Sequence, residues 1–206
     1  MQSETAESDK RSHILKIAGK LFLEHGFAGT SMGKIAAAGA GSKGTIYDYF
    51  RSKEELFVAF MSKEIQARAT LTFNPLSDAQ EPKETLMELG CRFVRLLTDP
   101  TTSALFRVVV HEAPHFPEIG RMFHEAGPKP AKQRLADYFN RCIEQRTLKI
   151  ADVPMAVEQF LLMCQACIWQ DFLFGLRGAP TDKELNKTVK AAVSTFLAAY
   201  ATDCCD

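Results

Sequence analysis

The sequence predicts an all-α fold in which a small N-terminal domain of three helices, containing a helix-turn-helix, precedes a larger helical domain. Residues 30–50 form two short helical patterns joined by a glycine-containing turn, which is typical of that motif. Residues 83–202 carry long amphipathic runs without strand-like alternation. A chain of 206 residues can bury a core in each of two domains. We therefore expect about nine helices, with residues 1–9 disordered, residues 10–53 forming the helix-turn-helix domain and residues 54–206 the second domain.

The first domain is expected to begin with a helix over residues 10–25, whose apolar residues recur at helical spacing and which ends at Gly26. Residues 30–38 (TSMGKIAAA) have a Thr/Ser start and small apolar positions, so they predict the next helix. The turn Gly39–Gly41 follows. Further along, SKEE at the start of Ser52–Phe73 spells a capping box, which predicts a long helix over that range.

Between the turn and the long helix lies SKGTIYDYF, which predicts a helix of one to two turns over Ser42–Phe50. Ser42 is a good N-cap, and Ile46 and Phe50 lie four residues apart on one buried face. The remaining side chains leave an exposed face of hydrogen-bond donors and rings. At about 1.5 Å per residue the helix is roughly 10–14 Å long, a size that fits a B-DNA major groove about 12 Å wide.

Residues 10–60 resemble the DNA-binding domain of TetR/AcrR-type bacterial regulators, through FLEHGF and TSMGKIAAAGAGSKGTIYDYFRSKEELF. The resemblance implies that some side chains hold phosphates, namely Thr30, Ser31, Tyr47, Tyr49 and Lys53. It implies that others approach base edges, namely Lys43, Gly44, Thr45 and Asp48. Packing in the core of the small domain is the alternative role for the tyrosines, and it weighs more for Tyr47 than for Lys43 or Thr45. The family usually has Ala-Gly-Val where this chain has Gly39-Ala40-Gly41, and an acidic Asp48 is repelled by phosphates.

The charge distribution supports this interpretation. The net charge of the whole chain is zero, which by itself argues against nucleic acid. Residues 10–53, however, hold eight Lys and Arg against two acidic residues, a local net charge of +6, so the flanking residues total −6. A basic segment that coincides with a helix-turn-helix is the electrostatic pattern of a DNA-facing end.

The second domain is expected to contain helices over 83–98, 101–112, two pieces around 127–130, 153–176 and 181–201. The helix over 153–176 is apolar around most of its circumference, so it needs a second packing partner besides its own core. Polar residues interrupt its apolar run, so we do not expect a membrane span. The resemblance implies a homodimer formed by a four-helix bundle of the last two helices of each chain. Two recognition helices related by a two-fold axis predict a pseudo-palindromic DNA operator.

The resemblance also implies a repressor that a small, apolar molecule releases from its operator. A second stretch, FRVVVHEAPHFPEIGRMFHEAGPKP, resembles the regulatory domain of an AcrR-like subgroup. Large apolar side chains are candidates to line the effector cavity, and the same residue types are the usual constituents of a core. The candidates are Phe93, Phe106, Met122, Phe123, Trp169 and Phe172. We expect no cofactor and no enzymatic activity.

Six cysteines in a chain without an apolar signal segment at MQSETAESDK favour a reducing, cytoplasmic location. Cys164 and Cys167 form a CxxC, but within an apolar helical run and without a second pair, so core packing is the expected role. Cys204 and Cys205, near the end of the sequence, are expected to be an incidental thiol pair.

A rival function of another class comes from His111-Glu112-Ala113-Pro114-His115, which matches the HExxH pattern of zinc hydrolases. His124 is a further candidate ligand in a metal-sensing version of this idea. Pro114 stands inside the motif, and its ring would clash with the carbonyl of Val110 in a continuous helix. We therefore interpret the match as coincidental and expect no metal.

Overall fold

The computed structural model describes residues 2–73 and 81–202, which fold into helices and connecting turns with one isolated antiparallel bridge between Leu148 and Ala201. The all-α prediction is confirmed. The chain divides into two compact units, the first comprising residues 1–67 and 104–127 and the second residues 68–103 and 128–206. The predicted domain boundary after residue 53 differs from this division, because residues 104–127 and the first part of the long helix pack with the N-terminal helices.

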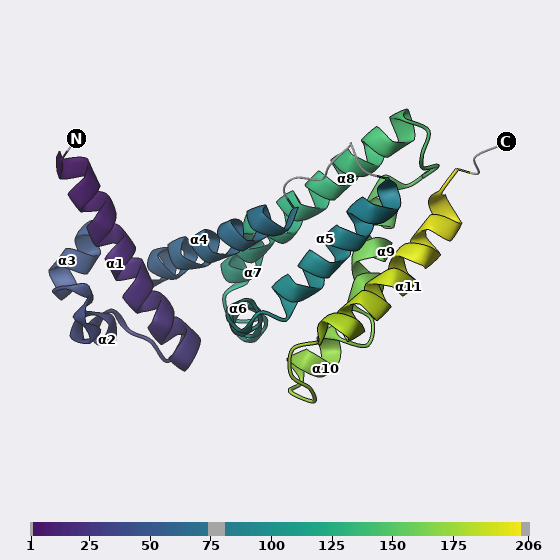
Figure 1. Cartoon of the computed structure of the whole chain (residues 1–206). Coiled ribbons are helices and arrows are strands. Elements are labelled where there is room, and N and C mark those ends of the chain that lie inside the picture. Colours follow the sequence, from purple (N-terminus) through teal and green to yellow (C-terminus); the bar gives the residue numbers. More distant parts are fainter. Residues whose placement is uncertain (1, 74–80, 203–206) are drawn as a thin grey trace. The chain divides into compact units, whose positions relative to one another are not determined.

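The first unit is built around the predicted helix-turn-helix (Figure 1). Its elements are α1 (Gln2–His25), α2 (Met32–Ile35), a π-helical turn (Ala36–Ala40), α3 (Lys43–Tyr49), the first part of α4 (Lys53–Phe73), most of α6 (Pro100–Glu112) and α7 (Pro117–Ala126). They share one core, whose fully buried members include Phe22, Ile35, Ile46 and Phe57. Burying the apolar face of each short helix against α1 and α4 fixes α2 and α3, since helices this short are not stable alone.

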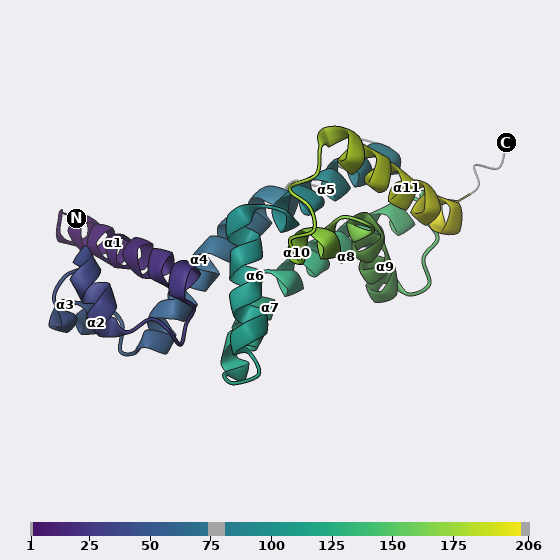
Figure 2. The same cartoon turned by 90° about the horizontal axis from the view of Figure 1, so that it is seen from below.

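The second unit is a bundle in which α11 lies against α5 and α9, and α9 lies against α5 and α8 (Figures 1 and 2). Its helices are α5 (Pro82–Leu97), α8 (Pro128–Glu144), α9 (Val153–Gln165), α10 (Trp169–Leu173) and α11 (Asp182–Tyr200). The core contains the stacked rings of Phe139 and Phe196, whose centroids are 5.0 Å apart. Gly90 of α5 permits the close approach of α11, because a Cβ there would lie 2.6 Å from Cγ1 of Val189.

Two predicted elements were wrong in their extent. Residues 153–176 do not form one helix, because Cys167 takes φ 61° and the chain changes direction between α9 and α10. The break buries Ile168 and exposes Cys167, so the apolar run is divided between two short helices. At the other end of the chain, α1 begins at Gln2, which leaves most of residues 1–9 helical rather than disordered. Glu, Ala and Gln in that stretch are good helix formers, and they extend the helix that the core anchors.

Other boundaries agree closely with expectation. α7 ends before Gly127 and α8 begins at Pro128, as the proline pattern indicates. The thiol pair Cys204–Cys205 lies outside the described residues. Within the described ranges, every helix is too short or too polar to cross a bilayer.

Candidate nucleic-acid interface

The start of α2 combines one exposed polar residue with one buried one. Ser31 is exposed and caps α2, its Oγ accepting a hydrogen bond from the N–H of Lys34 at 3.2 Å. Thr30 is buried, and its hydroxyl lies 3.1 Å from the carbonyl oxygen of Leu21 and 2.9 Å from that of Gly26. The Thr30 hydroxyl therefore ties α2 to the end of α1, and its side chain is not available to a phosphate as the sequence had suggested.

The turn between α2 and α3 depends on two glycines in conformations that other residues rarely adopt. Gly39 has φ 99° and Gly41 has φ 123° with ψ −174°. His13 of α1 braces the turn, because its Nε2 lies within hydrogen-bond distance, 3.2 Å, of the Gly39 carbonyl oxygen. This turn holds Gly39-Ala40-Gly41 where the family usually has Ala-Gly-Val, and Ala40 is buried between the two glycines.

The recognition helix α3 is capped and anchored as the sequence predicts. The Ser42 Oγ accepts a hydrogen bond from the N–H of Thr45 at 3.0 Å and lies 2.8 Å from the Thr45 Oγ1. Ile46 and Phe50 are fully buried. The guanidinium of Arg11 lies 4.9 Å from the centre of the Phe50 ring, so α1 holds the far end of α3 as well.

Opposite that anchored side, α3 presents the predicted contact residues. Lys43, Gly44, Tyr47 and Asp48 are all exposed, with Tyr47 at 48% of its full surface. Tyr49 differs, because it is partly buried and packs against the core of the first unit. The exposure of Tyr47 disfavours a role in core packing for that residue. Tyr49, in contrast, does contribute part of its ring to the core.

At the start of α4, Lys53 serves an intramolecular role that the sequence did not reveal. Its Nζ donates a hydrogen bond to the carbonyl oxygen of Phe27 at 2.9 Å and lies 4.0 Å from the centre of the Phe27 ring. The ammonium group has three protons, so these contacts leave donors for a phosphate. The predicted capping box forms only in part. The Ser52 Oγ accepts a hydrogen bond from the N–H of Glu55, but the Glu55 carboxylate accepts from the N–H of Arg51 at 2.8 Å instead of from the N–H of Ser52.

The HExxH-like stretch does not form a metal site. α6 ends at Glu112, and the carbonyl of Glu112 accepts hydrogen bonds from the N–H groups of His115 and Phe116 as the chain turns. His111 and His115 are exposed, whereas Glu112 is 2% exposed and its Oε1 accepts from the N–H of Ala28 at 3.2 Å. Across residues 2–73 and 81–202 no three His, Cys, Asp or Glu side chains gather as metal ligands would.

The six predicted effector-lining residues are divided between the two units. In the first unit, Phe106 and Phe123 make an edge contact, with ring centroids 6.0 Å apart. In the second, Trp169 and Phe172 stack at 6.4 Å, while Phe93 is buried against Phe73. Met122 is partly buried on α7. Of the six residues, Phe106 lies beside Phe123 and Trp169 beside Phe172.

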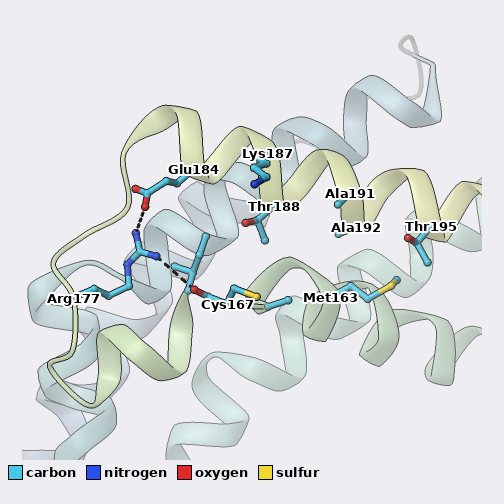
Figure 3. A pocket seen from close by; sticks show the side chains of 11 residues that line it. Met163, Cys167, Arg177, Glu184, Lys187, Thr188, Ala191, Ala192 and Thr195 are labelled. Atoms are coloured by element: carbon cyan, nitrogen blue, oxygen red, sulfur yellow. Dashed lines mark hydrogen bonds and ion pairs between the residues drawn. The ribbon is translucent and has the colours of Figure 1, made fainter.

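A cavity of about 470 Å³ does lie in the second unit, between the end of α9, the α10–α11 connection and the outer face of α11 (Figure 3). Small and polar side chains of α11 form one wall, including Thr188, Ala191 and Thr195. At one end, Arg177 donates hydrogen bonds to Oε1 of Glu184 at 2.9 Å and to the carbonyl oxygen of Cys167 at 3.4 Å. None of the six predicted lining residues belongs to this cavity, although Trp169 lines a neighbouring one of about 240 Å³.

The thiols of the CxxC lie in different environments. Cys164 is fully buried, and burial raises the pKa of its thiol to about 12. Cys167 is exposed at the break after α9. Core packing is therefore correct for Cys164 and wrong for Cys167, because the helix that was expected to bury both ends between them.

Comparison with known proteins gives two family models that together span most of the chain. The model described as "Bacterial regulatory proteins, tetR family" matches residues 14–60. The model described as "AefR-like transcriptional repressor, C-terminal domain" matches residues 84–202.

Individual relatives agree. The transcriptional regulator AcrR of Shigella flexneri is 25% identical over 205 residues, which covers 93% of this chain and 89% of AcrR. Among solved structures, the flavonoid-responsive regulator FrrA superposes with a TM-score of 0.84 at 28% identity, covering 95% of this chain and 99% of FrrA. A TetR-family regulator from Pseudomonas syringae pv. tomato gives a TM-score of 0.76 at 28% identity, covering 93% of this chain and 96% of that one. The chain belongs to the TetR family of DNA-binding transcriptional regulators.

Proposed function

We propose that α3 enters the major groove of an operator and reads base edges with Lys43, Gly44, Thr45 and Asp48. The observation that carries this proposal is the exposed face of α3, which is opposite Ile46 and Phe50 and begins with a capped, cationic N-terminus. A lysine at that position suits the acceptor edge of guanine, and Asp48 suits the amino group of cytosine.

Phosphate contacts flank that face in the proposal. Ser31 lies at the N-terminus of α2 and Lys53 at the N-terminus of α4, where backbone N–H groups and the helix dipole favour an anion. Tyr47 and the exposed part of Tyr49 add hydroxyl donors. Thr30 leaves this set because its hydroxyl is engaged within the chain.

The proposed partner on the second unit is another copy of the chain. The outer face of α9 carries Met155 and Leu162, which are 51% and 62% exposed. The outer face of α11 carries small residues such as Ala191, which permit close helix packing. In a two-fold dimer, α9 and α11 of one copy would pack against α9 and α11 of the other, fill the cavity of Figure 3 and form a four-helix bundle.

A dimer explains how so short a helix specifies a site. Two copies of α3 about 34–36 Å apart would engage successive major grooves of one duplex, which requires a pseudo-palindromic operator. Repression would then be relieved by a small apolar effector that binds the non-DNA-binding arrangement more tightly, by a coupling of about 1–3 kcal/mol. The name of FrrA, a flavonoid-responsive regulator, supports control by a small molecule.

The proposal describes a cytoplasmic, non-catalytic protein that binds duplex DNA, itself and one small molecule. Selection of bound fragments from random duplex DNA at a stated salt concentration tests its DNA-binding part. We expect a motif with two inverted half-sites about one helical turn apart. Recovery of a single, non-repeated half-site, or of no enriched sequence at low salt, would contradict it.

A further inference from the structure

One peptide group in the turn after α1 is held by a charged side chain at each of its two ends. The carbonyl oxygen of Phe27 accepts a hydrogen bond from Nζ of Lys53 at 2.9 Å. The N–H of the same peptide group belongs to Ala28 and donates to Oε1 of Glu112 at 3.2 Å. The cation faces the negative end of the peptide dipole and the anion its positive end, so both charge-assisted bonds are favourable.

These four residues come from three parts of the chain. Phe27 and Ala28 follow α1, Lys53 begins α4, and Glu112 ends α6, which is 84 residues from Ala28. Glu112 also lies in the segment that matches the regulatory-domain model, whereas Ala28 and Lys53 lie in the segment that matches the DNA-binding model. The bridged peptide group therefore connects the regulatory sequence to the DNA-binding sequence inside one compact unit.

Burial makes the bond of Glu112 decisive. Its side chain is 2% exposed, and a buried carboxylate without a partner is strongly unfavourable. Gly26, which begins the turn beside this contact, has φ 72°, a conformation that favours glycine. Phe116 adds an edge contact with the Phe27 ring, their centroids 5.2 Å apart. The end of α6 thus favours one position of the turn over others.

That turn leads directly into the proposed phosphate contacts. Thr30, buried two residues after Ala28, bonds to the Gly26 carbonyl, and the next residue is Ser31. We propose that Glu112 is a positioning residue for DNA binding. It fixes the Phe27–Ala28 peptide group, which in turn holds the Lys53 side chain and the turn before Ser31 in their DNA-contacting positions. The proposal rests on the proposed function, because that function places these two residues against the operator.

The test compares Glu112→Leu, Glu112→Gln and the native chain, with Glu118→Gln as a matched control on an exposed glutamate of α7. Operator affinity is measured by fluorescence anisotropy, normalised to the active fraction, and hydrogen exchange of the Ala28 amide is measured in the same proteins. Loss of a charge-assisted bond predicts that the Leu variant binds DNA about ten-fold more weakly and that its Ala28 amide exchanges about ten-fold faster. The Gln variant retains an acceptor oxygen and is expected within about three-fold of native on both measures. The control should match the native chain.

Native DNA affinity in the Leu variant would overturn the proposal, whatever its exchange rate. If the Leu variant unfolds, Glu112→Asp replaces it, because Asp keeps the charge but is one methylene too short. We then expect the Asp variant to bind DNA at least about five-fold more weakly than the Gln variant; equal affinities would overturn the proposal. Absence of any selected operator for the native chain would refute the proposed function instead, and the exchange of the Ala28 amide distinguishes that case because it needs no DNA.

Discussion

Replacing Gly41 with alanine is expected to destabilise the first unit and to displace α3. Gly41 has φ 123° and ψ −174°, a region of backbone conformation that is almost restricted to glycine. A Cβ at this position would also lie 3.4 Å from Cγ2 and 3.5 Å from Cβ of Thr45, the residue that Ser42 caps. These distances are ordinary van der Waals contacts, so the cost comes from the backbone. Strain of this kind costs about 1–3 kcal/mol, and we therefore expect a loss of about 2 kcal/mol in the stability of this unit.

Gly44→Ala is the matched control, because it makes the same chemical change three residues later with the opposite expected sign. Gly44 lies inside α3, and a Cβ there would meet nothing closer than Ser42 Oγ at 3.7 Å. Alanine reduces the backbone entropy lost on helix formation, which stabilises a helix position by up to about 0.5–1 kcal/mol.

Hydrogen–deuterium exchange of peptides that cover α2 and α3 measures the change in stability of the first unit, to which Gly41 and Gly44 belong. Tryptophan fluorescence would not, because the single tryptophan, Trp169, belongs to the second unit. A loss of about 2 kcal/mol corresponds to roughly 30-fold faster exchange in those peptides. Unchanged protection in Gly41→Ala, or equal losses in both variants, would refute the assignment of strain to this turn.

Three further outcomes are expected. Lys43→Gln should weaken operator binding by about 1–3 kcal/mol per half-site and broaden the base preference there, measured by titration of single-base operator variants; an unchanged preference would place Lys43 away from the bases. Leu162→Glu should raise the dimer dissociation constant at least about 100-fold in sedimentation experiments, since it puts a carboxylate on the outer face of α9; Leu71→Glu on α4, at a leucine that is even more exposed, should not. Because its pKa is raised to about 12, the Cys164 thiol is only about one part in ten thousand thiolate at pH 8. Alkylation mapped by mass spectrometry should therefore modify Cys167 and spare Cys164 until the protein unfolds.

Features that depend on a few neighbouring residues were predictable from the sequence. Ser42 caps α3 and Thr181 caps α11 with a full capping box, because each cap needs only its own first turn. The buried face of Ile46 and Phe50 follows from their spacing of four. The exposed face of α3 is the consequence of that burial, so the exposure of Lys43, Gly44, Tyr47 and Asp48 was predictable, whereas their contacts with DNA stay a prediction.

Features that depend on distant contacts were not predictable in this way. Thr30 has a residue type suited to phosphate binding and lies just before the N-cap Ser31, but carbonyl groups of α1 and the following turn engage its hydroxyl. No Gly or Pro lies near the break at Cys167 to indicate that the helix ends there. The break is accompanied by burial of Ile168 and by a bond from Arg177 to the Cys167 carbonyl, ten residues away in the sequence. Periodicity alone favours the longer helix.

The stretch from His111 to His115 shows how the same residues gain a different meaning once their element is known. A zinc site of this pattern requires a continuous helix, so that both histidines project from one face. Pro114 disfavours helical conformation at the residue before it, and α6 accordingly ends at Glu112. Glu112 therefore does not have the position relative to the two histidines that a catalytic base would need. Its carboxylate is buried and accepts a hydrogen bond from the backbone N–H of Ala28. Its chemistry is still that of a strong acceptor, but its partner is the N–H of Ala28 in the turn that leads into α2, which is the contact from which we inferred a positioning role.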